Sequence, residues 1–352
     1  MLDETFLTTD DVALVPQLGK LQSRAEAQLY GFIFTSPMDT VTGVKMAEAV
    51  VSTGHFATVC RFLESEWFET LKLVERKTVE GEINFLSNVF FAIGSKEKET
   101  KQLEMDLALV PDLRSINLNI DVAHGDTNHM HALYRLYSSK PYVANLMSGS
   151  ICTPEAAIRC FDSGCTHIRV GVGPGSACTT RLKTGCGIPQ LSAVSMIHQA
   201  LVEKGLRNKV KLIADGGVRS PGDAVKYLAA GADYIMMGRN FSSCPESPGW
   251  QHTKTNWWKK AILAKRYRGQ ASASFQEDLL GKTSDCPEGA TGPLIHPGRS
   301  AESIIKEFEG GVRSALSYLG LETLNQLSPE NVVFVKTTQS SLAEAMPHGT
   351  KQ

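Results

Sequence analysis

The sequence predicts an α/β protein built as a (β/α)8 barrel, with one domain over residues 1–352. Short apolar runs rich in β-branched and aromatic residues alternate along the chain with segments of helical spacing, and eight such runs are present. Glycine-rich turns follow the sixth, seventh and eighth runs. A doubly wound sheet usually has its glycine-rich turn after the first strand, where this chain has Ser36-Pro37-Met38-Asp39. The position of the turns therefore favours the barrel.

Most of the eight runs are continuously apolar, as expected for parallel strands that helices cover on the outside. The predicted strands span residues 30–37, 56–60, 88–94, 115–122, 141–147, 167–173, 210–215 and 233–238. Helical spacing is found at residues 42–53, 154–164, 190–204 and 220–230. Pro154 and Pro221 lie near predicted helix starts, where a missing N–H costs least, and Gly164 and Gly231 follow predicted helix ends.

The alternating pattern is interrupted after the eighth predicted strand. Residues 241–298 are rich in Ser, Gly, Pro and Lys, which is typical of a long irregular segment that serves as a flap or lid. Helical periodicity returns at residues 301–319, and residues 332–335 resemble a short strand. We expect the polar tail at residues 337–352 to be mobile.

Composition and charge exclude several classes of function. The formal net charge is −1, so no global field attracts nucleic acid or a membrane surface, and an anionic substrate has to be held by local groups. Residues 1–20 lack the features of a signal peptide, and no apolar run approaches the roughly 20 residues of a membrane span. The eight cysteines form no C-x-x-C pair and no zinc-type spacing. These features predict a soluble cytoplasmic protein with free thiols.

The loop after the sixth predicted strand holds the strongest candidate for chemistry. Its sequence is Gly171-Val-Gly-Pro-Gly-Ser-Ala-Cys-Thr-Thr-Arg181, a tight turn whose backbone groups are exposed for binding. In a barrel this loop lies at the carboxyl ends of the strands, where active sites are found. Cys178 is a nucleophile there if nearby donors or positive charge, such as Arg181 and Lys183, favour its thiolate. A structural turn with a passive cysteine is the alternative interpretation.

Two further glycine turns predict a phosphate site. Asp215-Gly216-Gly217 ends the seventh predicted strand, and Gly238-Arg239 ends the eighth. Barrels of this kind commonly bind phosphate at these two turns through backbone N–H groups and a helix N-terminus. Asp215 is placed to accept hydrogen bonds from ribose hydroxyls. Each glycine pair alone is more often an ordinary turn, whereas both in this order favour phosphate binding.

Two more carboxylates are candidates with weaker support. Asp121, in Asp121-Val-Ala-His124-Gly125 at the end of the fourth predicted strand, is placed to bind a carboxamide or a hydroxyl, although a structural carboxylate remains an alternative. Glu288 lies in the predicted flap. Alone it has the pattern of a solvated surface charge, but it is also a candidate acid/base partner for a hydroxyl such as that of Thr180.

Taken together, these segments resemble the IMP dehydrogenase/GMP reductase family. The resemblance covers nearly the whole chain, at residues 7–16, 38–41, 121–125, 171–181, 215–217, 222–223, 230–233, 267–269 and 310–314. It implies that Cys178 adds to C2 of a purine nucleotide, forming a thioimidate-type intermediate. It also implies that a nicotinamide cofactor exchanges a hydride at the same carbon.

Within the family, the sequence is most similar to GMP reductases. IMP dehydrogenases usually have a pair of CBS domains after the second strand, whereas residues 61–79 here lead directly toward the third. The dehydrogenases also use a mobile flap with an Arg-Tyr pair, and residues 270–298 contain no arginine. Residues 179–185 and 189–194 resemble the reductase pattern. The resemblance therefore implies conversion of GMP and NADPH to IMP and ammonia.

The resemblance also implies roles for individual residues. Cys178 is the nucleophile, with Thr180 and Glu288 assisting proton transfer. The substrate would contact Ser176, Asp215, Gly217, Gly238, Arg239, Arg268, Gly269 and Gln270, and the phosphate would contact Ser176, Gly217, Gly238 and Arg239. The cofactor would contact Asp121, Ala123, Thr179 and Arg181. A monovalent cation such as K+ would bind the backbone carbonyls of Gly173, Gly175 and Cys178, and the assembly would be a homotetramer.

Several positions depart from the family pattern. Gln270 stands where methionine is usual, Arg239 where the reductases have a small residue, and Arg61 near a usual His-Lys pair. Residues 145–147 and the dehydrogenase-like turn at residues 217–219 also differ. Three alternatives therefore stay open: an IMP dehydrogenase without CBS domains, a reductase of a modified or deoxy purine nucleotide, and a non-catalytic purine-nucleotide binder.

Overall fold

A computed structural model of the protein describes residues 5–253, 262–281 and 284–345. Eight parallel strands form a closed barrel, and the last strand pairs with the first to complete it. They are β2 (Ile33–Thr35), β3 (Phe56–Val59), β4 (Val89–Ile93), β5 (Ile116–Ile120), β6 (Val143–Ile151), β7 (His167–Val170), β8 (Lys211–Asp215) and β9 (Tyr234–Met237). Each predicted strand overlaps one of these, so the predicted (β/α)8 barrel is confirmed.

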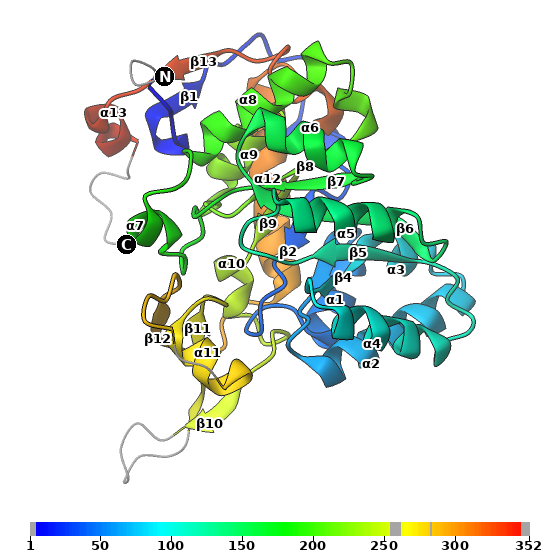
Figure 1. The fold of residues 1–352 in the computed structure, drawn as a ribbon. Helices are drawn as coiled ribbons and strands as arrows, with labels where there is room; N and C mark the ends of the chain where they lie inside the picture. Colours follow the sequence, from blue (N-terminus) through cyan, green and yellow to red (C-terminus); the bar gives the residue numbers. More distant parts are fainter. Residues whose placement is uncertain (1–4, 254–261, 282–283, 346–352) are drawn as a thin grey trace.

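Helices cover the outside of the barrel (Figure 1). They are α1 (Val44–Val51), α2 (Glu64–Val79), α3 (Ile83–Asn88), α4 (Glu97–Ala108), α5 (Asn128–Ser138), α6 (Pro154–Asp162), α8 (Gln190–Glu203), α9 (Pro221–Ala229) and α12 (Ala301–Tyr318). The short helix α7 (Thr180–Thr184) lies instead in the loop after β7, at the carboxyl ends of the strands. Pro154 and Pro221 begin α6 and α9 as predicted, behind the N-caps Thr153 and Ser220. Between β3 and β4 the chain forms only α2 and α3.

The barrel interior has an apolar layer below a polar one. Phe34, Phe90, Met147, Ile213 and Met236 form a buried cluster inside the barrel. Farther toward the carboxyl ends of the strands, Asn119 on β5 and Arg169 on β7 are buried. Because successive side chains of a strand alternate between its two faces, Arg169 points inward while its neighbours Ile168 and Val170 face the helices. This polar layer lies directly beneath the loops at the carboxyl ends of the strands.

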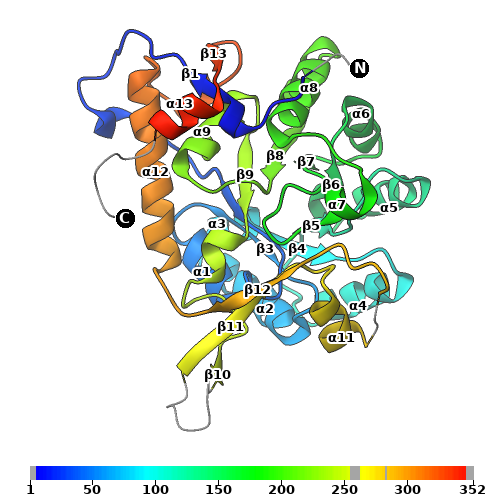
Figure 2. The ribbon, with the colours of Figure 1, turned by 90° about the vertical axis from the view of Figure 1, so that its left-hand side faces the viewer.

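The segment 241–298 is more regular than its sequence predicted. It begins at the end of α10 (Arg239–Ser242) and contains β10 (Gln251–Thr253), β11 (Ile262–Arg268), α11 (Ala273–Leu280) and β12 (Thr291–Ile295). The three strands form an antiparallel sheet in the order β10-β11-β12, which stands beside the barrel (Figure 2). β10 has only three residues, and β11 and β12 mix polar and apolar residues and pair across about 30 residues of chain, so local periodicity does not reveal them. Residues 254–261 and 282–283 of the predicted flap lie outside the described part.

The two ends of the chain are joined by a small sheet. Strand β1 (Val12–Leu14) pairs antiparallel with β13 (Phe334–Lys336), which confirms a strand near the predicted position. Residues 339–344 of the predicted tail form α13 (Gln339–Glu344), and residues 346–352 lie outside the described part. Short 3-10 turns occur at Thr9–Asp11, Arg24–Glu26, Arg207–Lys209 and Leu324–Gln326. None of the described helices combines the length and apolar character needed to cross a bilayer.

Candidate active site

A cavity of about 730 Å³ opens at the carboxyl ends of the barrel strands. Its size lies within the range of about 300–1,000 Å³ that is usual for small-molecule sites. Most of the predicted site residues line it: Asp121, Ala123, Gly173, Gly175, Ser176, Cys178, Thr180, Asp215, Gly217, Gly238, Arg239, Gly269, Gln270 and Glu288. The fold thus brings residues from six separate segments of the chain to one site.

Three side chains in this cavity form a continuous hydrogen-bonded relay. The Cys178 thiol donates to Thr180 Oγ1 at 3.1 Å, and the Thr180 hydroxyl donates to Glu288 Oε2 at 2.8 Å. All three residues are partly buried. The relay gives the thiol proton a path to a carboxylate, which is how a weak nucleophile is activated by a general base.

Backbone pairing brings Glu288 to the cysteine loop. The Thr179 N–H donates to the Glu288 carbonyl at 2.7 Å, and the Ala290 N–H donates to the Ala177 carbonyl at 2.8 Å. Cys178 and Gly289 also form an isolated antiparallel bridge. The segment before β12 is therefore held against the cysteine loop. Glu288 lines the cavity and is not an isolated surface charge.

The glycine turns bring the backbone close to the cavity. Gly217 has φ of +77°, and a Cβ atom there would lie 2.8 Å from the Tyr227 hydroxyl. Gly238 follows β9, and a Cβ atom there would lie 3.0 Å from Met38 Sδ. Gly217 lies in the turn before α9 and Gly238 directly precedes α10, and both glycines line the cavity. This arrangement has the features of a phosphate site.

Arg169 is a polar site residue that the sequence interpretation missed. Its Nε and Nη2 donate to Asp215 Oδ2 at 3.0 and 2.8 Å, and its Nη1 donates to Asp121 Oδ1 at 3.0 Å and to Asn119 Oδ1 at 3.3 Å. Burial opposes its charge, but the carboxylates of Asp215 and Asp121 outweigh that cost and raise the pKa of Arg169. One sequence signal was available: a charged residue in the middle of an otherwise apolar parallel strand.

Arg61 lies on the opposite side of Asp121. Its Nη1 is 2.8 Å from Glu99 Oε1, its Nε is 3.8 Å from Asp121 Oδ2, and its guanidinium lies 3.9 Å from the centre of the Phe62 ring. Neither Arg61 Nε nor Asp121 Oδ2 has a hydrogen-bond partner among the described residues, although both atoms are buried. Buried polar atoms are normally paired, so these two mark a place where a ligand would complete the hydrogen bonding.

Three predicted site residues do not line the cavity within the described part. Arg268 donates to Asp39 Oδ2 at 2.9 Å and also pairs with Asp278, so its guanidinium supports the flap. Arg181 donates from Nε to the Val172 carbonyl at 2.8 Å, which holds the cysteine loop. The third residue, Thr179, contributes the backbone contact to Glu288 described above. These three residues therefore hold the cysteine loop and the flap in position and do not line the cavity themselves.

Gln270 lines the cavity, and the nitrogen of its side-chain amide is already hydrogen-bonded. Its Nε2 donates to the Pro37 carbonyl in the loop after β2. The carbonyl oxygen of the same side chain is left as the group available to a ligand. The position where methionine is usual in the family thus presents a hydrogen-bond acceptor.

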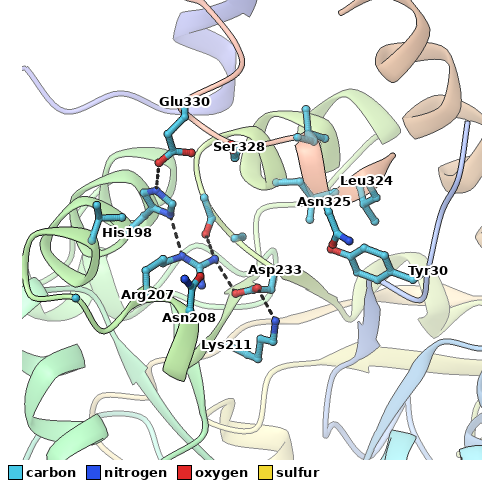
Figure 3. A pocket seen from close by; sticks show the side chains of 16 residues that line it. Tyr30, His198, Arg207, Asn208, Lys211, Asp233, Leu324, Asn325, Ser328 and Glu330 are labelled. Atoms are coloured by element: carbon cyan, nitrogen blue, oxygen red, sulfur yellow. Dashed lines mark hydrogen bonds and ion pairs between the residues drawn. The ribbon is translucent and has the colours of Figure 1, made fainter. Parts of the chain in front are cut away.

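A second cavity, of about 510 Å³, lies at the opposite end of the barrel (Figure 3). Its charged residues pair with one another: Glu330 with His198, His198 with Arg207, and both Arg207 and Lys211 with Asp233. It contains no cysteine or other activated nucleophile among its lining residues. The cavity with the relay is therefore the candidate active site.

The fold and site define a (β/α)8-barrel protein with a hydrogen-bonded thiol, that of Cys178, in a cavity at the carboxyl ends of its strands. A family model described as the IMP dehydrogenase / GMP reductase domain matches residues 2–348. The protein named GMP reductase 1 of Homo sapiens is 33% identical over 342 residues, which cover 94% of both chains. The protein named inosine-5'-monophosphate dehydrogenase of Borreliella burgdorferi is 29% identical over 395 residues, covering 97% of this chain and 96% of its own.

The chain belongs to the IMP dehydrogenase/GMP reductase family. A shorter match, 35% identical over 236 residues, joins 65% of this chain to 46% of the inosine-5'-monophosphate dehydrogenase of Thermoplasma acidophilum. Reductases and dehydrogenases are thus similar to this chain at comparable identity. The family resemblance of the sequence is confirmed, and the choice of reaction depends on the site.

Proposed function

We propose that this protein is a GMP reductase, an oxidoreductase that converts GMP and NADPH to IMP and ammonia. The observation that carries the proposal is the relay from Cys178 through Thr180 to Glu288. A reductive deamination needs a nucleophile for C2 and a proton for the departing amine, because an amide-type anion is a poor leaving group at neutral pH. The relay supplies both functions in one hydrogen-bonded unit.

The reaction begins when Cys178 Sγ attacks C2 of the guanine ring. The Sγ–C2 bond forms as the thiol proton moves through Thr180 toward Glu288. The C2–N2 bond then breaks, and ammonia leaves with the proton that the relay returns. When bound, NADPH supplies a hydride to C2. The Sγ–C2 bond finally breaks, so that IMP leaves and the thiolate regains a proton from solvent.

The nucleotide is held by the groups that the strand-end turns present. Backbone N–H groups at Gly217 and Gly238, with Ser176 and Arg239, bind the phosphate, and Asp215 accepts from the ribose hydroxyls. Arg239 supplies a positive charge beside these N–H groups, in keeping with a doubly charged phosphate. Gly269 and Gln270 lie against the base.

The cofactor fits the other half of the cavity. Asp121 Oδ2 is buried without a hydrogen-bond partner among the described residues, so a ribose hydroxyl or carboxamide donor there would satisfy it. Ala123 lines the same region, and Arg181 and Thr179 brace the cysteine loop beside it. The preference for NADPH over NADH is part of the proposal and rests on the resemblance to GMP reductases.

The cation and the assembly are proposed on the same basis. Carbonyl oxygens of Gly173, Gly175 and Cys178 are hard ligands of the type that K+ takes. The Gly175 carbonyl already accepts the Cys178 N–H at 2.9 Å, so it would be shared between the amide and the ion. A homotetramer is the expected assembly, and its mass in solution tests this.

A dehydrogenase without CBS domains is the second candidate, because dehydrogenases match this chain as well as reductases do. Residues 270–298 contain no arginine to activate a hydrolytic water, and this favours the reductase. The acceptor at Gln270 keeps a modified or deoxy purine nucleotide open as the substrate. A non-catalytic purine-nucleotide binder would not require the hydrogen-bonded relay of Cys178, Thr180 and Glu288.

The test is an assay of the purified protein with GMP and NADPH. We expect NADPH absorbance to fall while IMP and ammonia appear, with no reaction in Cys178→Ala and full activity in Cys186→Ser, which alters an exposed thiol outside the relay. A rise of NADH absorbance with IMP and NAD+ instead would assign the protein to the dehydrogenases. If the protein binds GMP but catalyses neither reaction, it is either a non-catalytic nucleotide binder or a reductase of a modified or deoxy purine nucleotide.

A further inference from the structure

The charged group inside the barrel calls for a functional explanation. Arg169 is 7% exposed, and it lies in the layer directly above the apolar cluster of the barrel core. Removing two carboxylates and a guanidinium from water costs several kcal/mol per ion, and apolar residues of similar volume often give equal or greater stability. Stability alone therefore does not account for Arg169 at this position.

The geometry of Arg169 joins two parts of the cavity that have different proposed ligands. One edge of the guanidinium binds Asp215 at the end of β8, the carboxylate proposed for the nucleotide ribose. The remaining nitrogen binds Asp121, the carboxylate proposed for the cofactor. Asp215 and Asp121 follow β8 and β5, which are not neighbours in the barrel, and Arg169 on β7 spans the space between them.

The hydrogen bonds also determine which carboxylate oxygens remain for ligands. Arg169 takes Asp215 Oδ2 and Asp121 Oδ1. Asp121 Oδ2 is left buried without a partner, and Asp215 Oδ1 accepts no hydrogen bond from the described side chains or backbone. Each carboxylate therefore has one oxygen fixed by Arg169 and the other without a hydrogen bond, and both residues line the cavity.

We propose that Arg169 is a positioning residue that orients both ribose-binding carboxylates and couples the affinity for the nucleotide to the state of the cofactor carboxylate. This inference rests on the proposed function, because it takes the nucleotide at Asp215 and the cofactor at Asp121. The positive charge of Arg169 is shared between the two carboxylates, and Arg61 lies 3.8 Å from the other oxygen of Asp121. Neutralising Asp121 leaves the whole charge of Arg169 to Asp215, which weakens Asp215 as an acceptor for the ribose.

A lysine cannot replace the guanidinium in this role. Arg169 uses three nitrogens on three acceptors in one plane, whereas an ammonium is a point charge on a flexible stem. Arg169→Lys therefore keeps the charge but releases the orientation of at least one carboxylate. We expect the KM values for GMP and NADPH both to rise about tenfold, with a smaller change in kcat.

The decisive experiment measures GMP binding alone, by calorimetry on the full chain without cofactor. Asp121→Asn alters a residue proposed to touch only the cofactor, and we expect it to raise the Kd of GMP about threefold. In an Arg169→Met background, the same Asp121→Asn change is expected to have no further effect on that Kd. This double-mutant cycle isolates the coupling through Arg169.

A matched control comes from the opposite end of the barrel. Arg207 is also a partly buried arginine that pairs with an aspartate, Asp233, and it lies in the second cavity (Figure 3). Arg207→Lys should leave the Kd of GMP unchanged. Far- and near-ultraviolet circular dichroism checks that each variant is folded before its Kd is compared.

The outcomes distinguish a failure of the coupling from a failure of the proposed function. A wild-type protein that binds GMP, with an unchanged Kd in Asp121→Asn, overturns the coupling and leaves the proposed function standing. An equal effect of Asp121→Asn with and without Arg169 overturns it as well. A wild-type protein that does not bind GMP overturns the proposed function and this inference together.

Discussion

Glu288 Oε2 lies 2.8 Å from Thr180 Oγ1, although 108 residues separate the two in the chain. The contact depends on the pairing of the segment before β12 with the loop after β7. It places a carboxylate at the far end of a relay that begins at the Cys178 thiol. Proton transfer along this relay is the step that the proposed chemistry needs most.

Removing the middle of the relay should lower catalysis without affecting binding. Thr180→Val keeps the size of the side chain and deletes the hydroxyl, so we expect kcat to fall about 10²- to 10³-fold while the Kd of GMP stays within about twofold. Thr184→Val, in the same short helix but exposed, is the matched control and should be fully active. Equal activity of the two variants would exclude Thr180 from proton transfer.

The nucleophile should be distinguishable from the other thiols by alkylation. All eight cysteines are free, and burial raises the pKa of Cys244 to about 12, so buried thiols react slowly. We expect iodoacetamide to modify Cys178 and the exposed Cys186 and Cys286, with peptide mass spectrometry as the readout. Saturating GMP should protect Cys178 alone, and unchanged labelling of Cys178 would place the nucleotide elsewhere.

Lys265 should make the stability depend on pH. It donates from Nζ to the Thr40 carbonyl, the Ser247 hydroxyl and the Pro248 carbonyl at 2.6–2.7 Å, and burial lowers its pKa to about 7. The unfolded chain has a lysine pKa of about 10.4. Between these two pKa values the unfolded state holds more protons, so the contribution of Lys265 to stability rises with pH.

The comparison of Lys265→Met with the wild type isolates this effect. The free energy of unfolding of the wild type, relative to the variant, should increase by about 3 kcal/mol between pH 6.5 and pH 9.5. Urea denaturation at the two pH values measures it. A relative stability that is constant or that falls with pH would contradict the lowered pKa.

Arg268 should control the order of the flap. It links β11 to Asp39 in the loop after β2 and to Asp278 in α11. We expect Arg268→Ala to speed amide hydrogen exchange in α11 and to raise the KM for GMP several-fold, because Gly269 and Gln270 follow it directly. Arg266→Ala, two residues away on the exposed face of β11, should change neither quantity. Slow exchange in Arg268→Ala would show that other contacts hold the flap.

Local sequence patterns were sufficient to predict much of the molecule. Each barrel strand is an apolar run that its own residues make visible, and Pro154 and Pro221 mark helix starts through a purely local steric effect. The glycines around Cys178 likewise predict a loop at the carboxyl ends of the strands. The reductase-type chemistry inferred from that loop stays a prediction.

The sheet β10-β11-β12 shows where local patterns fail. Strand β11 pairs with β10 and β12 through residues such as Lys265 and Ile295, and neither side of that pairing has strong strand character alone. A strand of this kind gains its stability from its partners, so its propensity is decided by tertiary contacts. The same holds for Arg268, whose partners at Asp39 and Asp278 direct it away from the cavity.

The barrel strands, the cysteine loop and the glycine turns could be predicted from the sequence, because each is indicated by residues that are adjacent in the chain. The folded chain was needed to choose between the two interpretations of Glu288, by placing it against Thr180, and to reveal that Arg169 joins Asp121 to Asp215. Hydrogen bonds and ion pairs act over a few ångströms, and residues from different strands come within that range only when the barrel closes. Arg169, whose partners follow from strand packing, is therefore the residue of the site that the sequence pattern did not reveal.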